Sequence, residues 1–476
     1  MKINPPPLSK KTPQSLKPLK KWWGIFRAYD IRGIYPEEIN EVVAYKIGRA
    51  FVKFLKKSTG KRVAKLNIVV GRDNRLSSPS LFKAIIKGII TEGAKVIDIG
   101  MSSTPMLYFA VAHYKFAGGI EITASHNPPQ WNGLKLVGEK GISISENTGL
   151  KEIRELTEEI TSRRLRGKGQ KVKKEILKDY LKFNLKEFDL KKFQPLKVVI
   201  DTANGVAGPV VAEIFQKIPG QIYHLFARLD GNFPNHPPDP LKKENLRWLR
   251  KEVKEKRADL GVAFDGDGDR IIFVDENGQI IPPDLITALM AKIILEKKPG
   301  EKILYDVCSN NIIKEIVEKT GGLPVLGRVG HSFIREKIRK ENIIFAGEFS
   351  GHYYLREYYF SEAPFFVLFK ILEELSKTEK TLSSLIKPFR KYFHSEGINF
   401  KVKDQKRILE LLEKKYKNGK VLKIDGLRID FPDWWFNIRP SQTEPVLRLV
   451  LEAKTKKLMK KKKKEIVKLL VTPEVA

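Results

Sequence analysis

The chain repeats one arrangement: a short apolar run, a segment with helical spacing, and a second apolar run. The clearest example is "LNIVVG" (66–71), followed by "PSLFKAIIKGIITEGA" (79–94) and "KVIDIG" (95–100). Two strands joined through a helix lie parallel in a sheet whose faces are covered by helices. The arrangement starts again at "LKVVIDTANGVAG" (196–208) and at "EKILYDVCSN" (301–310). The pattern predicts three related α/β units with mixed, mostly parallel sheets.

The C-terminal segment has a different pattern. The stretch "GLRIDFPDWWFNIRPSQTEPVLRLVLEAK" (426–454) alternates apolar and polar residues around a turn-rich loop, and a lysine-rich helix is expected after it. This predicts a fourth domain of α+β type. The charged stretch 156–174 predicts an exposed boundary between the first two units. The expected organisation is a disordered basic tail over 1–21 and four domains over 22–168, 169–278, 279–388 and 389–476.

Composition limits the class of protein. The 476 residues are 42% hydrophobic and 10% aromatic, which is enough apolar material for several folded cores. The single cysteine, Cys308, allows no disulfide within the chain and suits a reducing compartment. No apolar run reaches the roughly 18 residues of a membrane helix, and the basic N-terminus lacks the apolar stretch of a secretory signal. We therefore expect a cytoplasmic protein without a membrane span.

The net charge is strongly positive. Of the formal charge of +33, residues 1–24 contribute +6 and residues 454–468 contribute +8. A surface that binds nucleic acid or anionic membrane is therefore one alternative function. The positive charge is spread along the chain, however, and no dedicated nucleic-acid motif accompanies it. We expect a lysine-rich surface without a specific nucleic-acid partner.

The loop "FDGDGDR" carries three carboxylates at alternate positions, Asp265, Asp267 and Asp269. Like charges this close repel unless a cation lies among them, and so few hard oxygen ligands favour Mg²⁺. The spacing also opens an EF-hand, in which Glu276 would occupy position 12. The sixth position, which requires glycine, is Arg270, and the flanks read as strands. The loop therefore predicts a magnesium site at the end of a strand.

Three further stretches carry candidate binding groups. "RPSQTEP" offers Arg439, Ser441 and Thr443, which suit a dianionic phosphate, although a polar hairpin turn explains the stretch equally well. "GEFSGHYYL" is expected to be extended, with the alternating side chains of Glu348, Ser350 and His352 on one side. A carboxylate and a hydroxyl on one side suit a sugar, and a half-buried strand with a polar face is the alternative.

Two arginine-rich stretches precede these loops. "FRAYDIRG" places Arg32 beside a glycine turn as a plausible anion contact. In "GRDNRLSSP", Arg72 and Asp73 are expected to form a structural ion pair.

"TASHNPP" places Ser125 after an apolar run, next to His126 and Asn127. The two prolines that follow, Pro128 and Pro129, restrict the backbone. The G-x-S-x-G pattern of a hydrolase is absent. With a magnesium loop and a phosphate loop in the same chain, Ser125 is better interpreted as a phosphoryl carrier that points toward the acidic loop.

Taken together, these segments resemble the α-D-phosphohexomutase family, of the phosphomannomutase/phosphoglucomutase type. The resemblance extends from about Trp22 to the C-terminus, and five motifs occur in the family's order: "FRAYDIRG", "TASHNPP", "FDGDGDR", "GEFSGH" and "RPSQTEP". It implies three related α/β domains and a smaller fourth domain around a central cleft. The four domains would carry, in order, the phosphoserine, metal, sugar and phosphate loops.

The resemblance also implies roles for individual residues. The candidate catalytic residues are Ser125, His126, Lys135, Arg32 and His331. The candidate Mg²⁺ ligands are Ser125, Asp265, Asp267 and Asp269. Glu348 and Ser350 would contact sugar hydroxyls, and Arg439, Ser441 and Thr443 would hold the non-reacting phosphate. Tyr29, Arg270 and His352 would line the cleft. Lys135, His331 and Arg32 remain alternatives for the proton transfers.

The activity implied is a mutase that interconverts hexose 1-phosphate and hexose 6-phosphate through a phosphoserine and a hexose 1,6-bisphosphate. Mannose and glucose phosphates are the expected substrates, phosphoglucosamine is the alternative, and the protein would be a monomer or dimer. Three positions depart from the family's pattern: Cys308 where a basic residue is frequent, Pro364 in "SEAP" where an acidic-acidic-glycine turn is usual, and Gln442 in the phosphate loop.

Overall fold

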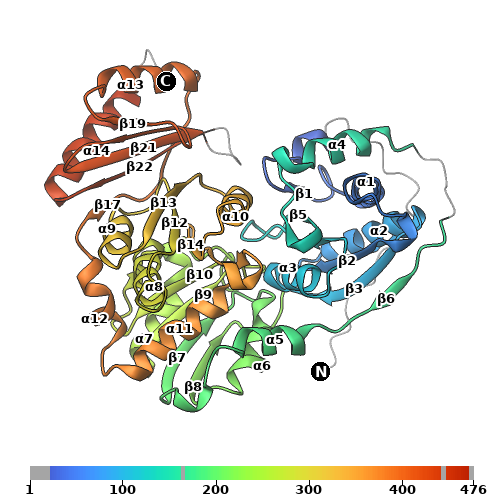
Figure 1. The fold of residues 1–476 in the computed structure, drawn as a ribbon, viewed down its shortest axis with the longest axis horizontal. Helices are drawn as coiled ribbons and strands as arrows, with labels where there is room; N and C mark the ends of the chain where they lie inside the picture. The colour runs from blue at the N-terminus through green and yellow to red at the C-terminus, as the bar shows by residue number, and fades with distance from the viewer. Residues whose placement is uncertain (1–21, 162–166, 441–445, 471–476) are drawn as a thin grey trace, which may run out of the picture.

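The computed structural model describes residues 22–161, 167–440 and 446–470, which form four successive sheets. The basic tail expected over 1–21 lies outside these residues. Short 3-10 turns connect several of the larger elements: η1 Trp22–Ile25, η2 Val63–Lys65, η3 Glu139–Gly141, η4 Glu146–Thr148, η5 Leu190–Lys192, η6 Lys243–Leu246, η7 Arg356–Tyr358 and η8 Lys387–Phe389. Figure 1 shows the first domain in blue on the right and the fourth in red at the upper left.

The first domain contains the predicted strand–helix–strand unit inside a six-stranded sheet. Its elements are β1 Ile31–Ile34, α1 Glu41–Thr59, β2 Asn67–Arg72, α2 Ser78–Thr91, β3 Lys95–Met101, α3 Thr104–His113, β4 Gly118–Ile122, β5 Trp131–Gly138, α4 Leu150–Glu159 and β6 Lys171–Lys173. The order is β1-β5-β4-β2-β3-β6, with β5 antiparallel to both of its neighbours. Because β6 pairs with β3, this sheet includes a strand beyond the boundary predicted at 168.

The second domain has a five-stranded sheet in the order β11-β10-β9-β7-β8. Its elements are α5 Leu177–Leu185, β7 Leu196–Asp201, α6 Ala207–Phe215, β8 Gly220–Leu225, α7 Arg247–Lys256, β9 Leu260–Phe264, β10 Ile271–Asp275 and β11 Ile280–Ile281. Strand β7 lies parallel to β8 and β9, whereas β9 and β10 are antiparallel. Both β9 and β10 are fully buried, so the acidic loop between them starts and ends in the core.

The third domain has the order β13-β12-β14-β15-β16. Its elements are α8 Pro283–Lys297, β12 Lys302–Asp306, α9 Ile312–Lys319, β13 Leu323–Gly327, α10 His331–Lys340, β14 Phe345–Gly347, β15 Tyr353–Leu355, β16 Ser361–Glu362, α11 Pro364–Lys377 and α12 Leu382–Ile386. Pro364 is the first residue of α11, a position at which proline is tolerated because its missing N–H has no intrahelical partner there.

The fourth domain is the α+β unit predicted from the alternating pattern. Its elements are β17 Phe393–His394, β18 Ile398–Phe400, α13 Gln405–Lys415, β19 Lys420–Leu422, β20 Leu427–Asp430, β21 Trp434–Pro440, β22 Leu447–Ala453 and α14 Lys456–Leu470. The strands pair antiparallel in the order β17-β22-β21-β20-β19, and β18 pairs with β22. The predicted lysine-rich helix is α14.

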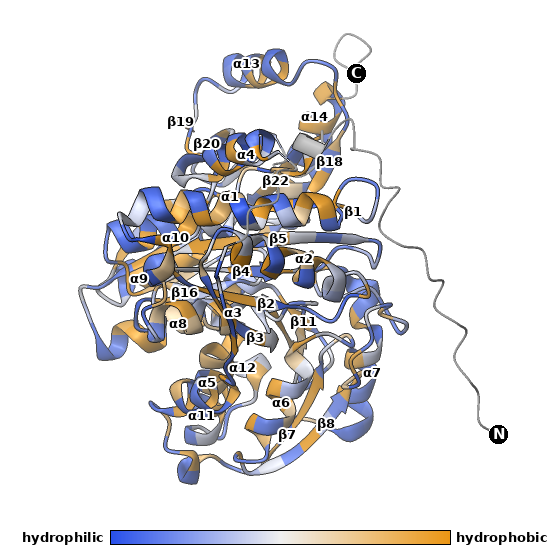
Figure 2. Ribbon diagram, turned by 90° about the vertical axis from the view of Figure 1, so that its right-hand side faces the viewer, coloured by the Kyte–Doolittle hydropathy of each residue, from blue (hydrophilic) through white to orange (hydrophobic). Residues whose placement is uncertain are grey.

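One hydrophobic cluster joins the first three domains. It runs from Val69 in β2 through Phe264 in β9 to Phe369 in α11, whereas the fourth domain has a separate cluster around Phe436. Figure 2 shows apolar strands inside the molecule and helices whose hydrophilic residues face outward. The shared core fixes the first three domains as one body, and the fourth is attached by other contacts.

Those contacts include a small apolar cluster, in which Val307 and Cys308 of the third domain meet Trp435 and Val450 of the fourth, and several polar interactions. Glu452 on β22 is 1% exposed and accepts hydrogen bonds from the main-chain N–H of Asn311 and from Trp435 Nε1, the latter at 2.7 Å. Arg428 on β20 donates to the main-chain oxygen of Val307 at 2.8 Å and to Asn311 Oδ1 at 2.9 Å. The fourth domain therefore rests on the loop that follows β12.

Candidate active site

Ser125 lies on a strained corner immediately beyond β4. All five residues of β4 are buried, and Ser125 itself has φ +50°, a left-handed conformation that side chains rarely adopt. Its N–H donates to Thr123 Oγ1 at 2.9 Å. Its Oγ donates to Asp265 Oδ2 at 2.7 Å, so the serine points at the acidic loop as predicted.

The acidic loop forms a buried trio of carboxylates. Asp265, Asp267 and Asp269 are 0% exposed, and one oxygen from each lies within 4.8 Å of the others. Among the described residues, Asp267 Oδ1 and Asp269 Oδ1 have no hydrogen-bond partner, and His352 Nε2 lies 3.3 Å from Asp269 Oδ1. Burial and the other two carboxylates hold the pKa of Asp265 well above its usual value. Unpartnered oxygens and mutual repulsion fit a divalent cation among the three, so the residues present suit a metal ion.

Lys135 brings a positive charge to the same trio from the first domain. Its Nζ lies 2.7 Å from Asp267 Oδ2 and 2.5 Å from Asp269 Oδ2. Burial alone would lower the pKa of Lys135, but the two carboxylates raise it well above its usual value. Thr104 at the start of α3 also donates to Asp267, at 2.5 Å. The strand β5 and the helix α3 thus bind the acidic loop to the first domain.

Arg75, which our reading of the sequence missed, organises the serine corner. Its Nη2 donates to the main-chain oxygens of Ser125 and Asn127, and its Nη1 to those of Pro128 and Trp131, at 2.7–3.1 Å. The side chain is 0% exposed, and Asp73 compensates its charge at 3.1 Å.

The expected ion pair between Arg72 and Asp73 is wrong, because Asp73 pairs with Arg75. Arg72 Nη1 instead donates to the main-chain oxygen of Asp73, at 3.0 Å.

Further basic side chains surround the serine. Arg32 donates to Asn127 Oδ1 and Asp30 Oδ2, both at 2.5 Å, which ties it to the serine loop. His126 Nδ1 lies 3.2 Å from Ser125 Oγ. Burial, followed by the charges of Arg270 and Arg32, holds the pKa of His126 well below its usual value.

Arg270 links the acidic loop to the third domain. Its Nε lies 3.8 Å from Asp265 Oδ2 and donates to His352 Nε2 at 3.4 Å.

The "GEFSGH" stretch is a tight hairpin turn, so its expected extended conformation is wrong. Glu348 follows β14, the N–H of Gly351 donates back to the main-chain oxygen of Glu348, and Gly351 has φ +83°. The turn still gathers the predicted side chains, because Ser350 Oγ lies 2.7 Å from His352 Nδ1 and His352 Nδ1 lies 3.6 Å from Glu348 Oε1. Glu348 also accepts hydrogen bonds from Tyr354 and from the N–H of Gly330.

His331 begins α10 and faces the first domain. The ring is 7% exposed and meets the ring of Tyr29 edge-on, with 4.8 Å between centroids. Its ring centroid lies 6.4 Å from that of His352. Tyr29, His331 and His352 therefore form one row that crosses from the first to the third domain.

The candidate phosphate loop lies only partly within the described residues. Ser441 and Thr443 fall outside them, as does Gln442. Arg439 at the end of β21 is 5% exposed, and its Nε lies 3.7 Å from Asp425 Oδ2. Asn437, two residues earlier on the same strand, contacts Cys308 Sγ through its Oδ1 at 3.7 Å. Arg439 thus belongs to the junction of the third and fourth domains and not to the carboxylate trio.

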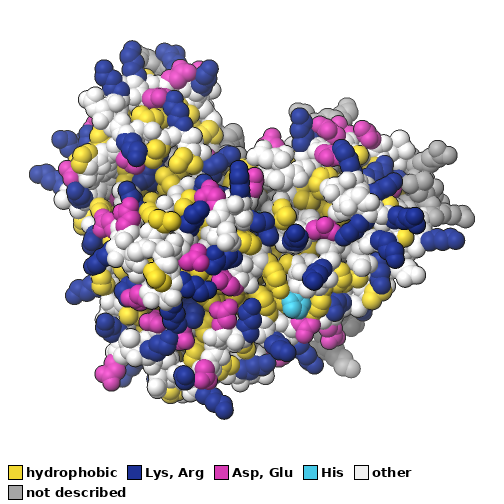
Figure 3. All heavy atoms as spheres, viewed as in Figure 1, with side chains coloured by type: hydrophobic (Ala, Val, Ile, Leu, Met, Phe, Trp, Pro, Cys, Tyr) yellow, Lys and Arg dark blue, Asp and Glu magenta, His cyan; other side chains and the backbone are white. Residues whose placement is uncertain are grey.

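The surface is hollowed between the lobes formed by the first and fourth domains, and dark-blue Lys and Arg side chains are scattered over this face (Figure 3).

In the described part of the chain, no helix is long and apolar enough to span a bilayer.

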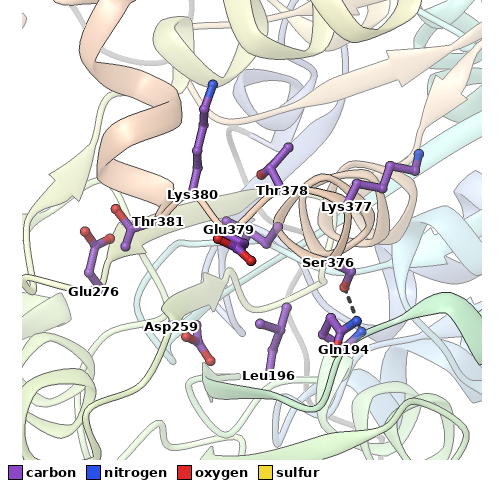
Figure 4. Close-up of a pocket in the computed structure, with 11 residues that line it drawn as sticks. Gln194, Leu196, Asp259, Glu276, Ser376, Lys377, Thr378, Glu379, Lys380 and Thr381 are labelled. Carbon is purple, nitrogen blue, oxygen red and sulfur yellow. Dashed lines mark hydrogen bonds between the residues drawn. The ribbon is translucent and has the colours of Figure 1, made fainter.

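A second hollow, of about 560 Å³, lies away from the site. It is lined by Asp259, Glu276 and the segment that joins α11 to α12, and Ser376 Oγ accepts a hydrogen bond there from the N–H of Gln194 (Figure 4). Asp259 precedes β9 and Asp265 follows it, so the two lie at opposite ends of one strand, roughly 20 Å apart at about 3.3 Å per residue.

Comparison with known proteins accounts for this combination of loops. Four family models match in order: phosphoglucomutase/phosphomannomutase alpha/beta/alpha domain I over 24–164, domain II over 147–278, domain III over 282–392, and the C-terminal domain over 398–469.

Individual relatives agree over nearly the whole length. A phosphomannomutase of Methanocaldococcus jannaschii is 41% identical over 449 residues, covering 94% of this chain and 97% of the relative. A phosphomannomutase of Vibrio cholerae is 40% identical over 455 residues, with 94% and 98% coverage. The crystal structure of a phosphoglucomutase/phosphomannomutase family protein from Burkholderia thailandensis superimposes with a TM-score of 0.85, 32% identity, and coverage of 94% and 96%. The chain therefore belongs to the phosphoglucomutase/phosphomannomutase family.

Proposed function

We propose that the protein is a hexose-phosphate mutase that moves a phosphoryl group between O1 and O6 of a sugar through Ser125. The observation that carries this proposal is the 2.7 Å hydrogen bond from Ser125 Oγ to Asp265, within a buried trio of carboxylates. A serine held beside candidate metal ligands suits phosphoryl transfer, which depends mainly on positioning and on neutralising charge. The basic side chains around the serine suit the same chemistry.

The reaction has two transfers that mirror each other. In the first, the bond between phosphorus and Ser125 Oγ breaks while a bond forms to the free hydroxyl of a hexose 1- or 6-phosphate. The proton of that hydroxyl passes to a base, and Ser125 Oγ takes up a proton. The resulting hexose 1,6-bisphosphate turns over in the cleft. In the second transfer, its other phosphoryl group returns to Ser125 Oγ, which gives up its proton, and the new sugar hydroxyl takes up a proton. Hexose 1,6-bisphosphate also loads the unphosphorylated enzyme, which makes it an activator.

Asp265, Asp267 and Asp269, together with an oxygen of phosphorylated Ser125, would hold Mg²⁺, which neutralises negative charge on the transferring group. The chain's own residues supply the rest. Lys135 presents a second positive charge beside the trio. Arg75 fixes the serine corner by donating a hydrogen bond to the main-chain oxygen of Ser125.

Binding of the sugar phosphate is assigned to the third and fourth domains. Glu348 and Ser350 at the hairpin turn would contact sugar hydroxyls. Arg439, with Ser441 and Thr443, would hold the phosphate that does not react. A cleft closed by the fourth domain would exclude water and suppress hydrolysis of the phosphoserine. His331 is the favoured base, because its Nε2 has no hydrogen-bond partner among the described residues. Burial, followed by the charge of Lys135, holds its pKa well below the usual value, so the ring is neutral and can accept a proton.

Mannose and glucose phosphates are the proposed substrates. The M. jannaschii and V. cholerae relatives are named phosphomannomutase, and a Pseudomonas syringae relative that is 38% identical over 436 residues is named phosphomannomutase/phosphoglucomutase. Phosphoglucosamine stays the alternative substrate.

A coupled assay with purified protein, Mg²⁺ and catalytic hexose 1,6-bisphosphate tests the proposal. Turnover of mannose 1-phosphate and glucose 1-phosphate is expected to exceed that of glucosamine 1-phosphate. Preference for the amino sugar would instead identify a phosphoglucosamine mutase. Absence of turnover with all three substrates would refute the proposed function.

A further inference from the structure

Three neighbouring side chains, those of His331, Arg335 and Glu362, hold five buried polar atoms with no hydrogen-bond partner within the described residues. They are both carboxylate oxygens of Glu362, the Nε and Nη1 atoms of Arg335, and the Nε2 atom of His331. Glu362 and Arg335 are each 2% exposed. Buried polar groups are nearly always paired, so such a concentration of unpaired ones needs an explanation.

The two oxygens of Glu362 face two different neighbours. Glu362 Oε1 lies 3.9 Å from His331 Nδ1, and Glu362 Oε2 lies 3.9 Å from Arg335 Nε. Both separations are slightly longer than a hydrogen bond. A small shift of α10 toward β16 would close both contacts together, because His331 and Arg335 lie one turn apart on the same helix.

Arg335 is itself fixed across the domain boundary. Its Nη2 donates to the main-chain oxygen of Gly141 and to Ser361 Oγ, and its guanidinium lies 3.8 Å from the centre of the Tyr108 ring. Gly141 and Tyr108 belong to the first domain, whereas Arg335 belongs to the third. These contacts leave Nε, which lies 3.9 Å from Glu362 Oε2, without a hydrogen bond among the described residues.

Glu362 is the last residue of β16 and lies two residues before Pro364, which begins α11. The Glu362 carboxylate has no hydrogen bond within the described residues, and burying a carboxylate without hydrogen bonds is destabilising. Its position between a guanidinium and an imidazole therefore points to a role in the reaction.

We propose that Glu362 is a positioning residue that orients His331, an inference that rests on the proposed mutase function. Its carboxylate accepts the Nδ1–H of His331 and the Nε–H of Arg335. This fixes the His331 tautomer in which Nε2 carries no proton. Nε2 then accepts the proton of the sugar hydroxyl that attacks the phosphoserine. The other neighbour of Nδ1, Ser332 Oγ at 3.4 Å, is a hydroxyl that can donate or accept, so it does not select a tautomer by itself.

A double-mutant cycle tests whether Glu362 acts through His331. Glu362→Gln keeps the size of the side chain, and kcat is expected to fall at least about tenfold while KM changes by less than about threefold. In a His331→Gln background, the same substitution is expected to change kcat by less than about twofold. An unchanged kcat in Glu362→Gln would overturn the proposal, as would an equal loss in both backgrounds.

The control variant is Glu357→Gln. Glu357 lies five residues earlier and forms a partly exposed ion pair with Lys298 at 3.0 Å, so kcat is expected to stay unchanged. Melting temperatures of all variants separate misfolding from loss of positioning.

Nitrogen NMR of histidine-labelled protein provides a readout independent of turnover. The His331 signal, assigned by its loss in His331→Gln, is expected to report protonated Nδ1 in the wild type and a mixture of tautomers in Glu362→Gln. Protonation at Nε2 in the wild type would overturn the proposal even if the enzyme is an active mutase. If His331 has the expected tautomer in a protein without mutase activity, the positioning role of Glu362 stands and the proposed function is refuted.

Discussion

The guanidinium of Arg75 donates a 2.7 Å hydrogen bond to the main-chain oxygen of Ser125. The same side chain holds three more carbonyl oxygens of the serine loop, and Asp73 neutralises it from the other side. A left-handed serine is a strained conformation that persists only when its surroundings impose it. Arg75 is the group that imposes it.

Replacing Arg75 by lysine is expected to lower kcat by at least about tenfold and to lower the melting temperature. A single ammonium cannot reach four carbonyl oxygens, and each buried one left unpaired costs about 1–3 kcal/mol. Steady-state kinetics and thermal unfolding measure the two effects. Arg72→Lys is the control, because Arg72 donates only to the main-chain oxygen of Asp73 and is expected to retain activity.

Replacing Ser125 by alanine is expected to reduce turnover by at least about 10³-fold, because the phosphoryl carrier is lost. Mass spectrometry after incubation with hexose 1,6-bisphosphate should find a phosphate on Ser125 in the wild type and none in the variant. Near-normal turnover by the variant would contradict the assignment.

Replacing Asp267 by asparagine is expected to leave stability without metal the same or higher and to weaken the stabilisation by Mg²⁺. Without metal, the variant should melt at the same or a higher temperature, because one of three repelling carboxylates is gone, and the asparagine oxygen still accepts from Lys135 and Thr104. The rise in melting temperature caused by Mg²⁺ should shrink, because binding to the folded state is weaker. An unchanged Mg²⁺-dependent shift would exclude Asp267 as a ligand.

Glu452 is expected to make stability depend on pH. Burial raises the pKa of Glu452 to about 8, although Trp435 and Asn311 oppose the shift. Between the usual glutamate pKa and about 8, the folded protein keeps a proton that the unfolded chain has released, so stability falls as pH rises. The stability of the wild type relative to Glu452→Gln should therefore decrease between about pH 5 and about pH 8, as measured by denaturant unfolding. A constant difference would show that Glu452 has an ordinary pKa.

Substituting the five lysines at 460–464 on α14 by glutamine is expected to leave mutase activity unchanged, because these residues lie on the helix that ends the fourth domain. This variant tests the alternative function of the basic surface. RNA or anionic-vesicle binding that is steeply salt-dependent and lost with these lysines, in a protein without mutase activity, would favour that alternative.

The parts of the site that the sequence predicted are those whose chemistry is local. Asp265, Asp267 and Asp269 stand between two apolar strands, and three close carboxylates in that position make physical sense only with a cation. Ser125 was predicted to point at them because its neighbouring prolines restrict the corner, and the hydrogen bond to Asp265 confirms this.

The parts that the sequence could not predict depend on main-chain atoms or on distant contacts. The acceptors of Arg75 are carbonyl oxygens some 50 residues later in the chain, and carbonyl oxygens leave no pattern in a sequence. Alternation of Glu348, Ser350 and His352 does not separate a strand from a tight turn, and the left-handed Gly351 decides the matter. Glu362 is distant in sequence from His331 and Arg335, and only the folded position of α10 places these two side chains next to it.

The hydrogen bond between Ser125 and Asp265 joins residues 140 positions apart, so the two partners are synthesised at different times. At about 5–20 residues per second, a ribosome makes the serine corner roughly 7–28 seconds before the acidic loop. During that interval the nascent first domain carries the serine corner without the carboxylates of the second domain. Ser125, the proposed phosphoryl carrier, therefore gains its hydrogen-bond partner Asp265 only after the acidic loop has been translated.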